Sequence, residues 1–261
     1  MTYPFWSEFT ILFIATLIGS AAVMPYSLEL LKSAMEKKAT KMSLPKIVLL
    51  SLLQTAVLFA AVTWLGLLLA HSIGLGAPYI EALIAHSVPP PLAPMLWAAV
   101  VIGFSGGLFL SLADFLFLPH LPKPLIDSSR KTSPLQNFAA SFYGGINEEI
   151  LMRLFGLSLI AWILSRVWHT STGLPTNIVF WFANIAMAVI FGLGHLPATK
   201  KITGAITPLL LIRSLILNGI IGIACGWLFV RYGIEAAIIA HFSADIIYHV
   251  GGSYVLRLLP E

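Results

Sequence analysis

The chain has 261 residues, of which 58% are hydrophobic and only 10% are charged, and its mean hydropathy is +0.92. Soluble domains carry about 25% charged residues, so this composition excludes an ordinary soluble domain and predicts an integral membrane protein in contact with lipid. The net charge of +4 does not indicate a nucleic-acid partner, because the lysines gather in short loops, where they report topology. With Cys225 as the only cysteine, an intramolecular disulfide is excluded.

Seven apolar segments each come close to the ~20 residues that a helix needs to cross a bilayer. They predict an all-α, polytopic transmembrane helical bundle with spans at residues 9–31, 46–70, 95–118, 138–165, 177–195, 205–230 and 234–257. An eighth span could lie in residues 71–94. Prolines there leave only an apolar piece at 79–88, which is too short to cross and is expected at the membrane surface.

The basic residues of the loops predict how the bundle is oriented. They concentrate in the first, third and fifth loops, as Lys32, Lys37, Lys38, Lys41, Lys46, Lys123, Arg130, Lys131, Lys200 and Lys201. The positive-inside rule places these loops in the cytoplasm. The N-terminus is then outside and the C-terminus cytoplasmic. The third loop, residues 122–134, contains three prolines and is predicted to be a non-helical connector.

We expect a single integral membrane domain over residues 1–261, in which 1–134 supply the N-terminal spans and loops. Residues 135–261 carry nearly all the chemistry. In the fourth span, Glu148, Glu149 and Arg153 interrupt an apolar run, although a charge near the bilayer centre costs roughly 3 kcal/mol. Glu149 and Arg153 are four residues apart on one helix face and are predicted to form an ion pair. Glu148 lies about 100° away around an α-helix and is free to point elsewhere and do chemistry.

The later spans add imidazoles to these carboxylates. His195 ends the fifth span, and His241 and Asp245 share one face of the seventh span, with His249 a further turn along. If every helix is straight, His195 lies near the cytoplasmic face and His241 nearer the outside, a difference in depth on the order of 15 Å.

Other embedded charges are interpreted as structural. Arg213 is expected either to pair with Asp114 or to extend toward an interface. Asp114 and Glu29 are likewise interpreted as structural residues.

Peptide hydrolysis requires an activated water, a proton donor for the leaving amine and a stabiliser for the oxyanion. Glu148 can take the proton of the water, and neutral His195 and His241 can orient that water or bind a metal. Asp245 can fix the tautomer of His241 or join a ligand set. Glu148, His195 and His241 also form a plausible Zn²⁺ set.

Three motifs follow one another on three spans: Glu-Glu-x-x-x-Arg at 148–153, Phe-x-x-x-His at 191–195 and His-x-x-x-Asp at 241–245. In this order they resemble the CPBP (Abi) family of intramembrane proteases, which includes the type II CAAX prenyl endopeptidases, the Ras-converting enzymes. The resemblance covers about residues 138–250. It implies that the chain cleaves peptide bonds within the membrane. The family is often classed with the metalloproteases, and a mechanism that depends on glutamate alone is the rival view.

The resemblance also implies roles for individual residues. In the first motif, which also contains Glu149 and Arg153, Glu148 would be the general base. His195 of the second motif would help to activate the water. His241 and Asp245 would stabilise the oxyanion or complete the site. The prenyl proteases carry Asn where this chain has Asp245, and an ionised carboxylate cannot donate a hydrogen bond. Asp245 is therefore either protonated, or orients His241, or binds metal.

The expected substrate is a membrane-associated peptide, either a prenylated CAAX-type protein or a membrane-bound pro-peptide. Two other functions stay open at this stage. One is an ion or proton transporter in which Glu148, His241 and Asp245 form a relay, although the chain lacks the internal repeat that many transporters show. The other is a non-catalytic scaffold or immunity protein in which the motifs hold helices together.

Overall fold

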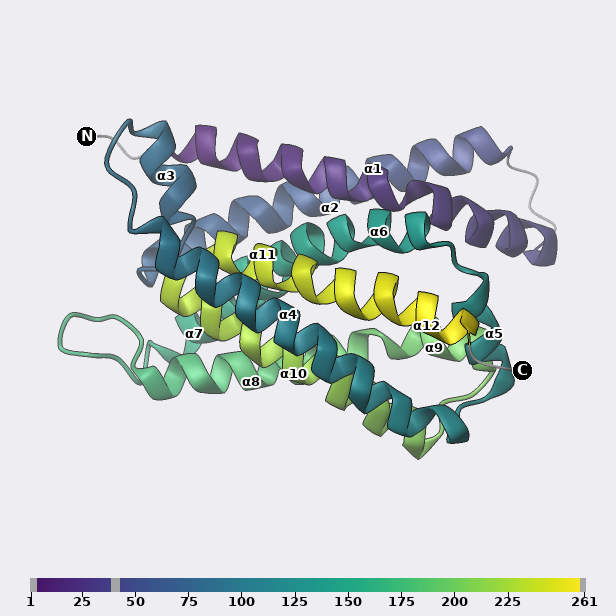
Figure 1. The fold of residues 1–261 in the computed structure, drawn as a ribbon. Helices are drawn as coiled ribbons and strands as arrows, with labels where there is room; N and C mark the ends of the chain where they lie inside the picture. The colour runs from purple at the N-terminus through teal and green to yellow at the C-terminus, as the bar shows by residue number, and fades with distance from the viewer. Residues whose placement is uncertain (1–3, 39–42, 259–261) are drawn as a thin grey trace.

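The computed structural model describes residues 4–38 and 43–258, and the regular structure within these ranges is helical. Five of the described helices are long and apolar enough to cross a membrane. These helices are α1 (Phe5–Lys38), α2 (Leu44–Ser72), α4 (Leu92–Phe117), α8 (Asn177–Gly194) and α10 (Pro208–Tyr232) (Figure 1). The prediction of an all-α membrane bundle is thereby confirmed, and each of the five falls on one of the predicted spans.

The predicted fourth and seventh spans are helical throughout but are built from shorter pieces. The fourth contains α6 (Pro134–Phe142), η2 (Tyr143–Glu148), η3 (Ile150–Leu157) and α7 (Ser158–Leu164). The seventh contains α11 (Ile234–Asp245), η4 (Ile246–Gly251) and α12 (Gly252–Leu258). The pieces η2, η3 and η4 are π-helical. Because π turns divide both segments, neither is a single continuous α-helix. The total of seven spans therefore stays a prediction.

The segments between the spans contain short helices. The apolar piece expected at the surface forms α3 (Pro78–Ile84), seven residues long and far too short to cross. The third loop, residues 122–134, was predicted to be non-helical, and that prediction is wrong, because most of it forms α5 (Lys123–Lys131). A short 3-10 turn, η1 (Leu118–His120), precedes it. The prolines of the loop stand beside or in the first turn of a helix, where a missing N–H breaks no hydrogen bond.

One end of the bundle gathers the basic loops. There α5 packs against α9 (Leu196–Thr203) and α12 (Figure 1). Arg257 donates from Nε to the carbonyl of Arg130 at 3.1 Å. The third loop, the fifth loop and the C-terminal helix therefore share one end, as the alternation of charge requires. Which face of the membrane this end meets stays a prediction, and Glu29 and the lysines at 32, 37, 38 and 41 lie outside the residues whose side chains are described.

Residues far apart in sequence bring the helices together. α8 packs along α10, α4 packs along α11, and η3 packs against α2. Asn147 of η2, fully buried, donates from Nδ2 to Thr16 O at 3.0 Å and to Ser20 Oγ at 2.9 Å, and so joins the fourth span to α1. The outward faces carry large apolar side chains such as Val57, Trp97, Phe104, Ile178 and Phe182, which suits contact with lipid.

Of the two alternatives expected for Arg213, the structure shows the pairing with Asp114. Arg213 Nε lies 2.6 Å from Asp114 Oδ1, and its Nη2 lies 2.7 Å from Oδ2. Tyr248 of η4 donates its hydroxyl to Asp114 Oδ2 at 2.8 Å. This bidentate pair satisfies a charge on each of α4 and α10 and fastens η4 beside them.

Two glycines let α4 approach α11 at backbone distance. A Cβ at Gly103 would lie 2.3 Å from Ala240 O, and one at Gly107 would lie 2.6 Å from Ala244 O. We expect Gly107→Ala to destabilise the fold by roughly 1–3 kcal/mol, because the two helices must separate to admit the methyl group. Unfolding in detergent measures the effect. Gly219→Ala is the matched control, since no atom lies within 4 Å of its added Cβ, and equal stability of the two variants would contradict this packing.

Candidate active site

The two glutamates of the fourth span stand at the junction of two π-helical pieces. Glu148 is the last residue of η2, and Glu149 lies between η2 and η3. π turns are rare and occur frequently at functional sites. Gly144 and Gly145 bring this junction against α11, since a Cβ at Gly144 would lie 2.4 Å from Asp245 Oδ2. The local sequence thus places both carboxylates within reach of the seventh span.

His241 of α11 lies at the centre of the site and is 4% exposed. Its Nδ1 is 2.6 Å from Glu149 Oε1. Because an ionised carboxylate can only accept, we assign the proton of this bond to Nδ1. The other ring nitrogen, Nε2, faces Glu148 Oε2 at 4.0 Å and Asp245 Oδ1 at 3.7 Å. Both distances exceed a hydrogen bond, so Nε2 is oriented toward two carboxylates without being bonded to either.

Glu149 is committed to structure. Arg153 Nη1 lies 2.9 Å from Glu149 Oε1, which is the ion pair predicted from their spacing. Both side chains are buried, at 0% and 2% exposure. Arg153 also donates from Nη2 to the carbonyl of Gly222 on α10 at 3.0 Å, and its guanidinium lies 5.1 Å from the centre of the Phe191 ring. Glu149 therefore holds His241 and Arg153 together and is closed to solvent.

Glu148 differs from Glu149 in access. Its side chain is 24% exposed, and that of Asp245 is 14% exposed. On an ideal α-helix Glu148 was expected to point away from its neighbour. Both glutamates nevertheless approach His241, Glu149 at Nδ1 and Glu148 at Nε2. Glu148 is thus the carboxylate that combines contact with the site and access to it.

His195 caps the C-terminus of α8, and its Nδ1 lies 2.9 Å from the carbonyl oxygen of Phe191. Its ring meets the Phe191 ring edge-to-face, with centroids 4.8 Å apart, and His241 meets the same ring at 5.8 Å. The second and third motifs therefore converge on one phenyl ring, and the difference in depth expected for straight helices does not keep the two imidazoles apart. His249 lies at the edge of the site, half exposed and 3.7 Å from Asp245 Oδ1.

Potential metal ligands are arranged differently from the predicted set. Among the described residues, donor atoms of Glu149, Cys225 and His241 lie within 4.8 Å of one another, whereas Glu148, His195 and His241 do not form such a group. At Glu149 a metal would compete with the guanidinium of Arg153. In this arrangement the residues do not fit a metal at the predicted set, and zinc there stays a prediction. Cys225, which motif spacing missed, sits between Gly222 and Gly226 on the face of α10 that packs on the site.

The fold and this cluster together define an all-α membrane protein with a buried carboxylate–imidazole site shared by spans four, five and seven. Residues 130–247 match the family model described as type II CAAX prenyl endopeptidase Rce1-like. This region contains every predicted site residue, and its match to the Rce1-like family model confirms the recognition made from the three motifs. No curated protein and no solved structure matches the chain.

Proposed function

We propose that this chain is an intramembrane endopeptidase that hydrolyses a peptide bond in a membrane-associated substrate. One observation carries the proposal. His241 is held at Nδ1 by the buried Glu149, 2.6 Å away, while its Nε2 faces the accessible Glu148 at 4.0 Å. A base beside an oriented imidazole, both shielded by helices, is an arrangement suited to activating a water. The family match over residues 130–247 supports the same reaction class.

In the proposed reaction Glu148 is the general base. It accepts a proton from the attacking water, whose oxygen bonds to the scissile carbonyl carbon. The C–N bond then breaks, and Glu148 returns the proton to the leaving amine. Glu149 does not suit this role, because it is fully buried and already faces Arg153 and His241. It acts as a positioning residue.

The imidazoles orient the reacting groups. With a proton on Nδ1, His241 leaves Nε2 facing Glu148 and Asp245, where this nitrogen can form a hydrogen bond with the water. His195, held against Phe191, is proposed to contact the same water or the substrate carbonyl. Because the donor atoms of Glu148, His195 and His241 do not gather into one group, the proposed reaction assigns no step to a metal.

The proposed substrate class is a prenylated CAAX-type C-terminus. The description of the matching family supports it. The test uses the purified chain in proteoliposomes, a farnesylated peptide, and the same peptide with serine in place of the modified cysteine. Mass spectrometry of the products should show cleavage of the farnesylated peptide only. Equal cleavage of both peptides would refute selectivity for the lipid and leave the protease itself in place, while a membrane-bound pro-peptide would become the favoured substrate.

Substitutions of Asp245 test whether this side chain helps to stabilise the oxyanion. Its Oδ1 lies 3.7 Å from His241 Nε2, and its side chain is 14% exposed. Asp245 occupies the position where the prenyl proteases carry Asn. We expect Asp245→Asn to retain activity, because an amide fills the same volume and can donate a hydrogen bond, and Asp245→Ala to lose most of it. Initial rates on one substrate decide the matter, and an inactive Asp245→Asn beside an active Asp245→Ala would contradict this role.

A further inference from the structure

A second cluster of ionisable residues lies at the end of the bundle opposite to α5 and α9 (Figure 1). Glu8 from the start of α1, His71 from the end of α2 and Glu81 from α3 place one donor atom each within 4.8 Å of the others. The Oε2 atom of Glu8 lies 3.1 Å from His71 Nε2. None of the three residues belongs to the candidate active site or to residues 130–247.

The carboxylate of Glu8 is not satisfied by this one contact. Glu8 is 0% exposed, and its second oxygen, Oε1, is buried without a hydrogen-bond partner. Within the described residues, Glu8 forms an ion pair with His71. A buried oxygen without a partner destabilises the fold, and more so when the group is charged. The cluster therefore contains a buried carboxylate with one oxygen beside His71 and the other unsatisfied.

Further negative charge surrounds the cluster. Glu235 of α11 accepts hydrogen bonds at Oε1 from the backbone N–H of Tyr79, at 2.9 Å, and of Ile80, at 3.0 Å. Its Oε2 is also buried without a partner. Three carboxyl groups thus converge on the ends of α1, α2 and α3, beside the imidazole of His71. A bound cation would balance this charge.

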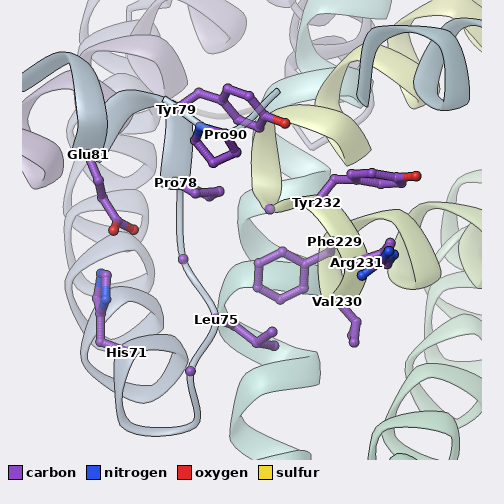
Figure 2. Close-up of a pocket in the computed structure, with 13 residues that line it drawn as sticks. His71, Leu75, Pro78, Tyr79, Glu81, Pro90, Phe229, Val230, Arg231 and Tyr232 are labelled. Atoms are coloured by element: carbon purple, nitrogen blue, oxygen red, sulfur yellow. The ribbon is translucent and has the colours of Figure 1, made fainter. Parts of the chain in front are cut away.

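The position of Glu81 is held from the backbone. Its Oε1 accepts a hydrogen bond from the N–H of Ala77 at 3.0 Å, a contact of the kind that orients metal-binding carboxylates. Gly76 passes close by, since a Cβ there would lie 2.5 Å from Glu81 Oε1 and 2.9 Å from His71 Cε1. Figure 2 shows His71 and Glu81 pointing toward one another at the wall of a cavity of about 450 Å³.

We propose that Glu8, His71 and Glu81 bind a divalent transition metal of the zinc class. One imidazole nitrogen and two carboxylate oxygens are a ligand set that Zn²⁺ accepts. Bonds of about 2.0–2.2 Å place tetrahedral ligands roughly 3.3 Å apart, and Glu8 Oε2 and His71 Nε2 are already 3.1 Å apart. His71 and Glu81 also line the cavity, from which water can complete the coordination. The metal ties the ends of α1, α2 and α3 together at the membrane surface.

Metal content tests this proposal directly. The chain is produced with added zinc and purified in detergent without chelators, and zinc per chain is measured by mass spectrometry of the elements. We expect His71→Gln and Glu81→Gln each to contain about one zinc fewer per chain than the wild type, whereas Glu148→Gln at the candidate active site keeps this zinc. An equal number of zinc ions per chain in the wild type, His71→Gln and Glu81→Gln would overturn the proposal.

A second measurement on the unmodified chain guards against variants that fail to fold. A ligand that binds only the folded state raises the melting temperature, so a chelator should lower the Tm of the wild type, and added zinc should restore it. His71→Gln should show no response to either. A wild-type Tm that ignores chelator and zinc overturns the proposal. Neither measurement involves peptide cleavage, so loss of this site and loss of the proposed protease activity are separable.

Discussion

Replacing Glu148 with glutamine is expected to slow peptide-bond hydrolysis by roughly 10²–10⁴-fold, the usual contribution of a general base. Glutamine keeps the shape of the side chain but cannot accept the proton of the water. Because the Glu148 side chain is 24% exposed and 4.0 Å from the nearest nitrogen of His241, the substitution breaks no hydrogen bond of the fold. Initial rates in proteoliposomes should therefore fall while the melting temperature stays unchanged.

The matched control for Glu148 is Asp127→Asn, the same change of carboxylate to amide on the exposed surface of α5, which should leave the rate at the wild-type value. Glu149→Gln provides the contrast. It should lower both activity and stability, because it weakens contacts to Arg153 and His241 at once. If Glu148→Gln cleaved substrate at the wild-type rate, the assignment of the base would be wrong.

The second large effect concerns stability and follows from the buried pair of Glu149 and Arg153. We expect Arg153→Met to destabilise the fold by about 3–5 kcal/mol, because removing one partner leaves a buried charge without compensation. Glu149 is 0% exposed, and Arg153 also donates to the carbonyl of Gly222 at 3.0 Å. Methionine keeps much of the apolar length, so the loss reports the charge. Equilibrium unfolding in detergent measures it.

A double variant separates the charge from the packing. Adding Glu149→Gln to Arg153→Met removes the orphaned carboxylate and should recover part of the lost stability, as neighbouring sites are not additive. Lys201→Met on exposed α9 is the control and should change little. An Arg153→Met variant as stable as Lys201→Met, or strict additivity in the double variant, would show that the pair does not carry the stability assigned to it.

Much of the fold could be predicted because membrane helices are encoded locally. The span expected at 177–195 is α8, Asn177–Gly194, which begins after Thr176, whose hydroxyl accepts the N–H of Val179. Two ion pairs could also be expected from the sequence, one from helical spacing and one from the rarity of charged residues in the spans. Glu149 with Arg153 needed only the i, i+4 rule, and Arg213 with Asp114 followed from the scarcity of embedded charge.

The details of the site could not be predicted because they depend on departures from the ideal helix and on packing. No residue pattern predicted the π turns within 143–157 or the approach of Glu148 to the same imidazole as Glu149. Cys225 and Tyr248 became neighbours of charged groups only through the packing of α10 and η4. The gathering of His195 and His241 on Phe191 likewise depends on helix placement that spacing alone does not determine.

The cluster of Glu8, His71 and Glu81 had no sequence signal, because these residues are far apart in the chain and carry no motif. Glu8, His71 and Glu81 come from three different helices and meet only where α1, α2 and α3 end together. The helix in the third loop was missed for a simpler reason. Prolines were interpreted as breaking a helix, but Pro122 and Pro124 stand at the start of α5, where proline is tolerated.

The central claim is that the cluster around His241 splits a peptide bond with water. Its most direct test is cleavage of a membrane-anchored, farnesylated peptide by the purified chain in proteoliposomes made in ¹⁸O-labelled water, followed by mass spectrometry of the products. The account predicts a new C-terminal carboxylate that carries the label in the wild type and is missing with Glu148→Gln. An intact peptide, or cleavage that persists unchanged without Glu148, would contradict it.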